Sequence, residues 1–385
     1  MDKTIEKYIY EILQQAEAEN CHSHDIYELV SPDEPIILYG AGQCLSSFNM
    51  TVLEKYPLNI TAILDENAKC GQLWNGIPVR TPAEYKIPDN LKTAIITIGK
   101  NEYLSSVREL LTQMGVDNII FAKDIYQFYT MIVPEEMERE KHFYFRKNIS
   151  RIIKAGLMLH DAESIEIFLK ILEIYILRIP QDIPCRAAET QYFPEDLFDL
   201  RSYQNIVHCG GYHGETILQM NKIFGKVNSL ICIEGDINNY SVMQKNLFPY
   251  RKNIADEMIL LPVFVSNDIS TAQFKSDGIV SRKSAAGNLI LPAIPLDYLL
   301  SNYIPTYITM DIEGEEMEAL DGCRNIIKDH KPDMAISIYH NPTHLWEIML
   351  KIYEYCPEYT FAIRNYTGGV SDTILYACSP DNRKA

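Results

Sequence analysis

The sequence lacks an excess of basic residues. Its 35 lysines and arginines stand against 52 aspartates and glutamates, which gives a formal net charge of −17 and a pI near 5.0. Proteins that bind the phosphate backbone of nucleic acids usually need a basic face. The composition therefore argues against a nucleic-acid partner.

The sequence also lacks long apolar runs. A membrane-spanning helix would need about 18 consecutive apolar residues, and no such run occurs. Residues 1–7 do not form the basic start that leads into the apolar core of a signal peptide. These absences predict a cytoplasmic protein without membrane insertion.

Closely spaced cysteines are missing as well. The nine cysteines include no C-x-x-C pair, and several lie inside apolar runs such as 207–209 and 231–233, which is typical of reduced core residues. The nine histidines show no ligand spacing with them, so the sequence predicts no zinc site. His340 and His344 are four residues apart, but Pro342 argues against one continuous helix there.

What the sequence does contain is a repeated alternation of apolar strands and helices. Its 385 residues are too many for one core, so we expect an α/β protein with two doubly wound Rossmann-like sheets. Residues 1–125 are predicted to form an N-terminal Rossmann-like domain with a leading helix. Residues 126–200 are expected to be a helical connector, and residues 201–385 a second α/β domain.

The first sheet has the features of a nucleotide fold. A buried strand at 36–39 enters a turn containing Gly40 and Gly42, and the next strand ends in Asp65, at a suitable distance for a ribose. The third glycine of a G-x-G-x-x-G fingerprint is replaced by Leu45. Residues 65–82 resemble Rossmann-like domains of proteins that handle sugars and surface polysaccharides. A second nucleotide site and a structural or substrate-docking domain therefore both stay open.

The second sheet carries a more complete set of signals. The strand at 205–209 runs into Gly210, Gly211 and Gly214, where backbone N–H groups can approach a ligand. The next strand ends in Glu234, which is placed to hold ribose hydroxyls. After the third strand, we assign Asn267 or Asp268 to the adenine of the cofactor.

The order of strands and helices in residues 205–378 indicates which cofactor to expect. Residues 266–293 are expected to be irregular and polar. Strands separated by crossovers are followed by a final pair, at 359–364 and 373–378, joined by a short turn. A nicotinamide dehydrogenase does not need this terminal hairpin. The class I methyltransferase sheet has seven strands with an antiparallel last strand, so S-adenosylmethionine is the expected cofactor.

Four separated motifs resemble the FkbM family of methyltransferases over residues 200–378. The fourth strand of that family ends in K-x-D-x-E-G-x-E, matched here by Thr309, Asp311, Glu313, Gly314 and Glu316. Residues 335–340 and 373–377 resemble the family's late strands. Three positions depart from the family pattern, which has aspartate at His208, lysine at Thr309 and proline at Gly235.

The end of the fourth strand is the expected catalytic position. A hydroxyl acceptor of a methyl group needs a base, and Asp311 faces the crevice where such sheets bind substrate. We predict Asp311 and His340 as acceptor-positioning or base groups, with Glu313 third. The alternatives are a turn or capping role for Asp311 and helix-dipole roles for Glu315 and Glu316. Carboxylates suit magnesium, and Asp311, Glu313 and Glu316 could hold a divalent metal, but the sequence does not require one.

The resemblance implies an S-adenosylmethionine-dependent O-methyltransferase acting on a saccharide or a related polyhydroxylated metabolite. Two other functions stay open. One is a nucleotide or nucleotide-sugar binding protein that has lost activity, which the residues at 208 and 309 would permit. The other is an NAD-dependent sugar-modifying enzyme that uses the turn at Gly40. The sequence leaves a homo-oligomer open.

Overall fold

The chain forms two compact units in a computed structural model, which describes residues 2–18, 26–98, 103–122, 141–177, 182–199, 202–276, 281–283 and 289–380. The large unit comprises Met1–Leu13, Ile132–Leu172 and Ile183–Ala385, and the small unit comprises Gln14–Met131 and Glu173–Asp182. The predicted boundaries at residues 125 and 200 fall outside the described residues and stay a prediction.

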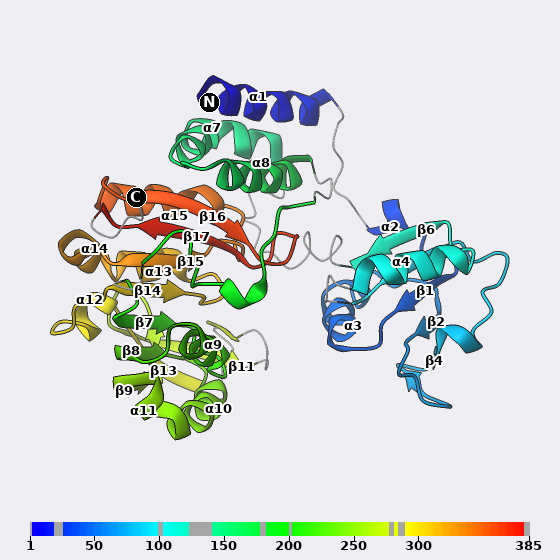
Figure 1. The fold of residues 1–385 in the computed structure, drawn as a ribbon. Coiled ribbons are helices and arrows are strands. Elements are labelled where there is room, and N and C mark those ends of the chain that lie inside the picture. Colours follow the sequence, from blue (N-terminus) through cyan, green and yellow to red (C-terminus); the bar gives the residue numbers. More distant parts are fainter. Residues whose placement is uncertain are drawn as a thin grey trace. The chain divides into compact units, whose positions relative to one another are not determined.

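The small unit is built on a six-stranded sheet with the order β3-β4-β2-β1-β5-β6 (Figure 1). Its neighbouring strands run parallel, except that β3 and β4 form an antiparallel hairpin. Strands β1 and β5 are fully buried, which explains why they appear in the sequence as continuous apolar runs. The strands are β1 Ile36–Tyr39, β2 Ile60–Leu64, β3 Leu73–Trp74, β4 Ile77–Arg80, β5 Thr93–Ile96 and β6 Asn118–Phe121. The helices are α2 Ile26–Leu29, α3 Gln43–Phe48 and α4 Leu104–Gln113.

The large unit is built on a seven-stranded sheet with the order β16-β17-β15-β14-β7-β8-β9. Strand β17 is antiparallel to both of its neighbours, and the other pairs are parallel. The predicted sheet with an antiparallel last strand is therefore confirmed. The strands are β7 Asn205–Cys209, β8 Val227–Ile233, β9 Ala255–Leu261, β14 Tyr307–Met310, β15 Asp333–Ser337, β16 Thr360–Asn365 and β17 Thr373–Cys378. The helices between them are α9 Glu215–Phe224, α10 Ile237–Leu247, α11 Arg251–Ile254, α12 Leu296–Leu299, α13 Glu316–Asp321, α14 Arg324–His330 and α15 His344–Tyr355.

A second, four-stranded sheet in the large unit corrects the prediction of an irregular segment at 266–293. Its order is β10-β13-β11-β12. Strand β11 pairs antiparallel with β13 along most of its length, so its backbone groups are satisfied despite the polar sequence. Apolar alternation is weak in this stretch, which is why the sequence did not predict strands. The strands are β10 Phe264–Val265, β11 Ser270–Ser276, β12 Ser281–Lys283 and β13 Leu289–Ile294.

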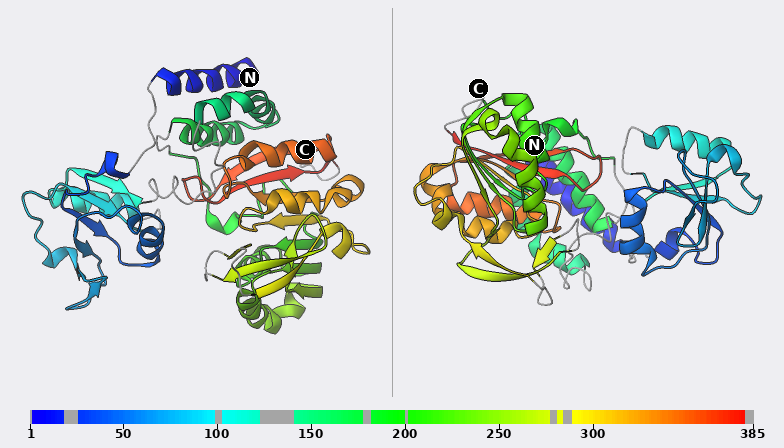
Figure 2. Two further views of the ribbon diagram at one scale, coloured as in Figure 1. Left: turned by 180° about the vertical axis from the view of Figure 1, so that it is seen from behind. Right: turned by 90° about the horizontal axis from the view of Figure 1, so that it is seen from below.

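Helices α1 (Asp2–Ala18), α7 (Lys141–Leu157) and α8 (Ala162–Leu177) form a layer beside β16 and α15 (Figure 1), and the same layer is seen from behind in Figure 2. The three helices pack closely at Gly156, where a Cβ atom would lie 3.1 Å from Phe168 and 3.2 Å from Ile5. Helix α7 meets α15 through Phe145, whose ring centroid lies 6.1 Å from that of Trp346. Residues 141–172 of the predicted connector therefore belong to the large unit.

The structure also bears on the predictions of reduced core cysteines and of no membrane insertion. The cysteines of the described residues are all free, which agrees with the prediction of reduced thiols. Five of them are buried, whereas Cys44 is half-buried and Cys70 and Cys185 are exposed, so the core role does not extend to these three. Among the helices that the structure describes, none combines the length and the apolar character needed to cross a bilayer.

Candidate active site

The turn after β7 lies tightly between the two neighbouring strands. Gly210 has a φ of +93°, and a Cβ atom on it would lie 1.9 Å from the backbone oxygen of Asp311. A Cβ atom on Gly211 would lie 2.4 Å from Sδ of Met243. Both glycine N–H groups donate to the carbonyl of Ile233, at 2.9 and 3.0 Å. Glycine is therefore required here by close packing and, at Gly210, by backbone conformation.

Gly214 completes the turn and precedes helix α9. Its φ is +89°, and a Cβ atom on it would lie 2.9 Å from Leu247 of α10. Glycine has no side chain that could cap the helix, so the turn presents backbone N–H groups at the start of α9. The three glycines predicted from the sequence thus form one turn at the carboxyl end of β7.

Glu234 follows β8 and faces this turn. Its Oε2 atom accepts a hydrogen bond from the N–H of Tyr212 at 2.7 Å, and its Oε1 atom accepts one from the N–H of Asp236 at 2.7 Å. The residue is buried, and burial raises the pKa of its carboxyl to about 7. The carboxylate charge is therefore only partly compensated, and its remaining lone pairs are suited to hydroxyl donors.

The raised pKa of Glu234 predicts a pH-dependent stability. Because the folded pKa of about 7 exceeds the ordinary value of 4.5, the stabilisation is full below pH 4.5 and is lost as the pH rises through 7. Relative to a Glu234→Gln variant, the free energy of unfolding of the wild type should fall by up to about 3 kcal/mol over this range. Urea unfolding at several pH values, followed by the fluorescence of Trp346 in a Trp74→Phe background, measures this difference. A constant difference between the two proteins would contradict it.

His208 and Thr309 form a direct pair between β7 and β14. The two residues are in register, and Nδ1 of His208 lies 2.5 Å from Oγ1 of Thr309. His208 is buried, and burial lowers its pKa to about 4. The histidine is therefore neutral at physiological pH. Its other ring nitrogen, Nε2, has no hydrogen-bond partner among the described residues, and the absence of a catalytic role stays a prediction.

Asp311 lies at the end of β14, where three other side chains converge on it. Its Oδ2 atom accepts a hydrogen bond from the hydroxyl of Tyr192 at 2.6 Å, and Oδ1 accepts one from Tyr339 at 3.3 Å. Nε2 of His340 lies 3.4 Å from the same Oδ1 atom. The structure thus brings the predicted pair Asp311 and His340 together, in contact with two tyrosines.

Glu316 lies beneath this group and is fully buried. Its Oε1 atom accepts hydrogen bonds from the N–H groups of Ile312 and Gly314, at 3.0 and 3.3 Å, and contacts Nδ1 of His340 at 2.9 Å. Its Oε2 atom lies 3.3 Å from Nδ1 of His344. Glu316 therefore does more than complement the dipole of α13, because it connects the turn after β14 to both histidines.

The ionisation of His340 and Glu316 is coupled. Burial alone would lower the pKa of His340, but the carboxylates of Glu316, Asp311 and Glu313 together outweigh it and raise the pKa to about 9. Burial would likewise raise the pKa of Glu316, but His340 and His344 hold it well below its usual range. Oε2 of Glu313 lies 3.7 Å from Nε2 of His340, so all three predicted catalytic residues lie in one cluster.

Asn267 and Asp268 lie in the exposed turn between β10 and β11. Asp268 is engaged in the turn itself, because its Oδ1 atom accepts a hydrogen bond from Ser270 at 3.2 Å and its carbonyl accepts one from Ser266 at 2.9 Å. This arrangement explains the local turn. The adenine role of either residue stays a prediction.

The small unit repeats the arrangement of the large one. Gly40 has a φ of +106°, and a Cβ atom on it would lie 2.8 Å from the carbonyl of Thr97. The carboxylate of Asp65 accepts the N–H of Ala41 and the N–H of Asn67, both at 2.8 Å, as Glu234 does in its own turn. Gly42 has open space around its Cα, since a Cβ atom on it would meet no atom of the described residues within 4 Å.

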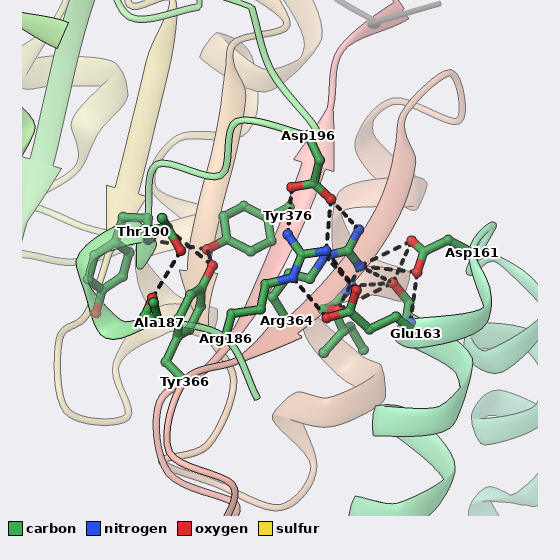
Figure 3. A network of polar contacts seen from close by, with 12 residues as sticks. Asp161, Glu163, Arg186, Ala187, Thr190, Asp196, Arg364, Tyr366 and Tyr376 are labelled. Atoms are coloured by element: carbon green, nitrogen blue, oxygen red, sulfur yellow. Dashed lines mark hydrogen bonds and ion pairs between the residues drawn. The ribbon is translucent and has the colours of Figure 1, made fainter. Parts of the chain in front are cut away.

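Tyr192 was not predicted, because it comes from the segment before β7, which carries no recognisable motif. The segment is fixed by a network of two arginines and three acids (Figure 3). Arg364 of β16 is buried and contacts Asp161 at 3.1 Å and Asp196 at 3.0 Å. Arg186 also binds Asp196, at 2.7 Å, and Glu163. Tyr192 lies between the two anchored positions 186 and 196.

Tyr339 and His344 are further residues of the cluster that the sequence did not assign. Tyr339 immediately precedes His340, and a pattern of strand ends could have identified it. His344 begins α15, and the separation of His340 from this helix agrees with the expected effect of Pro342. Neither residue can be assigned to the cluster around Asp311 until β14 and β15 are known to be neighbours.

Comparison with known proteins bears on the family resemblance and on the fold. Residues 208–363 match the family model described as Methyltransferase FkbM domain. A solved structure of methyltransferase FkbM from Methylobacillus flagellatus KT is similar with a TM-score of 0.74 at 20% sequence identity, over 98% of this chain and 100% of that chain. The resemblance to the FkbM family and the two-sheet fold are thereby confirmed.

Other solved structures are less similar. Aeropyrum pernix fibrillarin in complex with natively bound S-adenosyl-L-methionine has a TM-score of 0.32 at 11% identity, over 50% of this chain and 74% of that chain. A likeness of this size has no bearing on the site. Among curated proteins, none matches the sequence.

Proposed function

We propose that this chain, which carries a segment matching the Methyltransferase FkbM domain, is an S-adenosylmethionine-dependent methyltransferase. The observation that carries the proposal is the placement of Glu234 and Asp311 after two strands that flank the glycine turn at 210–214. One carboxylate suits the ribose of the cofactor and the other suits a hydroxyl acceptor. The acceptor is proposed to be a saccharide or a related polyhydroxylated metabolite in the cytoplasm.

The cofactor side of the site consists of the glycine turn and Glu234. Gly210, Gly211 and Gly214 let the turn pack closely against Asp311, Met243 and Leu247, which fixes the position of the first N–H groups of α9. Glu234 would accept hydrogen bonds from ribose hydroxyls, which compensates a carboxylate that burial has made costly to ionise. Asn267 or Asp268 would meet the adenine. When bound, S-adenosylmethionine supplies a methyl group activated by its sulfonium.

The acceptor side consists of the cluster at the ends of β14 and β15. Asp311 and His340 would position the acceptor hydroxyl or take its proton, with Glu313 as the third candidate. Because its pKa of about 9 keeps His340 protonated at neutral pH, Asp311 is the better proton acceptor of the two. The hydroxyls of Tyr192 and Tyr339 hold the Asp311 carboxylate in place.

The small unit is proposed to dock the acceptor or to bind a nucleotide at Gly40, Gly42 and Asp65. The observation that favours a ligand is the hydrogen bond that the Asp65 carboxylate accepts from the glycine turn of the small unit. The Glu234 carboxylate accepts a hydrogen bond of the same kind from the glycine turn of the large unit. Glu234→Ala and Asp65→Ala are therefore a matched pair of variants, because each removes the carboxylate that contacts one of the two glycine turns.

Isothermal titration calorimetry with S-adenosylmethionine, S-adenosylhomocysteine and NAD tests the proposal. We expect the first two ligands to bind and Glu234→Ala to weaken them about 10- to 100-fold, which corresponds to losing a hydrogen bond to a charged group. Asp65→Ala should leave this affinity unchanged, because it lies in the other unit.

Three results would contradict the proposed S-adenosylmethionine site or the proposed methyl transfer. If NAD binds and S-adenosylmethionine does not, and Asp65→Ala removes the binding, the chain is better described as an NAD-dependent sugar-modifying enzyme. If Asp65→Ala and not Glu234→Ala weakens S-adenosylmethionine, the cofactor site is wrongly placed. Binding of nucleotide sugars alone would favour a protein that has lost methyl transfer.

A further inference from the structure

We propose that Asp311, Glu313 and His340 form a binding site for a divalent transition-metal cation, with Glu316 orienting the histidine. Asp311, Glu316 and His340 each offer a ligand atom, and these atoms lie within 4.8 Å of one another. The Nε2 atom of His340 lies 3.4 Å from Oδ1 of Asp311 and 3.7 Å from Oε2 of Glu313. One imidazole nitrogen thus lies near an oxygen of each of two carboxylates.

These separations suit a metal centre. With metal-to-ligand distances of about 2.1 Å, two ligand atoms are about 3.0 Å apart in an octahedral arrangement and about 3.4 Å apart in a tetrahedral one. The observed 3.4 Å falls within this range, whereas the 3.7 Å separation exceeds it, so the Glu313 side chain would have to move toward Asp311 to complete the site.

The Nε2 atom of His340 provides the second, independent observation. The histidine side chain is only 6% exposed, and this atom has no hydrogen-bond partner among the described residues. The other ring nitrogen contacts Oε1 of Glu316 at 2.9 Å. A carboxylate that holds one nitrogen of a histidine orients the ring for binding a metal through the other, as is usual for histidine ligands. A cation that binds Nε2 would displace the proton that this atom carries at neutral pH. A cation would satisfy this buried atom.

The charges of the cluster favour a cation as well. Asp311, Glu313 and Glu316 contribute three carboxylates, and His340 and His344 are the imidazoles in contact with them. A negative charge remains even when both imidazoles are protonated. Since an imidazole nitrogen is one of the ligands, we expect manganese, iron or zinc to bind more tightly than magnesium or calcium.

The site differs from the zinc site that the sequence argued against. That argument considered the spacing of cysteines and histidines along the chain, whereas these ligands come from the ends of two adjacent strands. The binding of a cation is also independent of the proposed methyl transfer, so the test requires neither cofactor nor acceptor.

The experiment uses the full chain after treatment with EDTA and dialysis. Manganese chloride is titrated in, and free Mn²⁺ is followed by electron paramagnetic resonance. We expect one Mn²⁺ per chain, and we expect Asp311→Asn and His340→Gln each to weaken binding at least about tenfold. Asp256→Asn is the control, because it removes a carboxylate that is 67% exposed and lies in an ion pair with Lys226 in the same unit.

Circular dichroism confirms that each variant is folded. Should either variant unfold, Glu313→Gln replaces it, because this side chain is 36% exposed and its change is smaller. The proposal is overturned if the wild type shows no saturable binding up to about 1 mM Mn²⁺. It is also overturned if the folded site variants bind as tightly as Asp256→Asn, or if Mg²⁺ competes equally with Mn²⁺.

Discussion

The replacement Gly210→Ala is expected to destabilise the large unit by more than about 4 kcal/mol and to abolish cofactor binding. Its Cβ atom would lie 1.9 Å from the backbone oxygen of Asp311, and that oxygen belongs to the strand-end residue of β14. Neither strand can move away without breaking the pairing of β7 with β14. Urea unfolding followed by Trp346 fluorescence, in a Trp74→Phe background, measures the loss.

The matched control is Gly225→Ala. Gly225 lies in the same unit and also has a positive φ, of +76°, but a Cβ atom there would meet no atom of the described residues within 4 Å. Backbone strain alone should cost about 1–3 kcal/mol at this position. The difference between the two variants therefore isolates the close approach. Equal losses would show that contact with Asp311 is not the cause of the glycine requirement.

The replacement Arg364→Met is expected to destabilise the large unit by about 2–3 kcal/mol, because it removes the charged hydrogen bonds that the buried guanidinium donates to Asp161 and Asp196. The guanidinium of Arg364 is 3% exposed and joins Asp161, before α8, to Asp196, before β7 (Figure 3). The loss should be measured by the same unfolding assay. Tyr192, which lies in the anchored segment, should also lose its fixed position beside Asp311.

Arg186→Met is the control for this network. Arg186 contacts Glu163 and Asp196 as well, but its side chain is 30% exposed, so water can replace much of the interaction. We expect a loss of about 1 kcal/mol. A loss for Arg186→Met as large as that for Arg364→Met would mean that burial does not determine the strength of the network.

The topology could be predicted because the central parallel strands are buried over most of their length. Strands β7, β8, β14 and β15 appear as short apolar runs, and the residue after each run lies at the same edge of the sheet. Glu234 and Asp311 were identified in this way. The terminal hairpin made the methyltransferase sheet distinguishable from a dehydrogenase sheet.

The remaining features depend on contacts between distant segments. Tyr192 reaches Asp311 across 119 positions in the chain, and no local pattern indicates such a pair. Glu316 looks like an ordinary acidic residue at a helix start, and only the fold shows that it is buried between two histidines. Strand β11 is polar, so its pairing with β13 leaves no apolar periodicity in the sequence.

The contact of His208 with Thr309 changes how the two departures from the FkbM pattern should be understood. The pattern has aspartate and lysine at these positions, and the structure shows that the two positions are cross-strand partners in a buried part of the sheet. A His208→Asp or a Thr309→Lys replacement alone would bury a charge without its counterion, at a cost of about 3–5 kcal/mol. The two departures are therefore linked energetically, because the side chains at 208 and 309 meet in one buried contact.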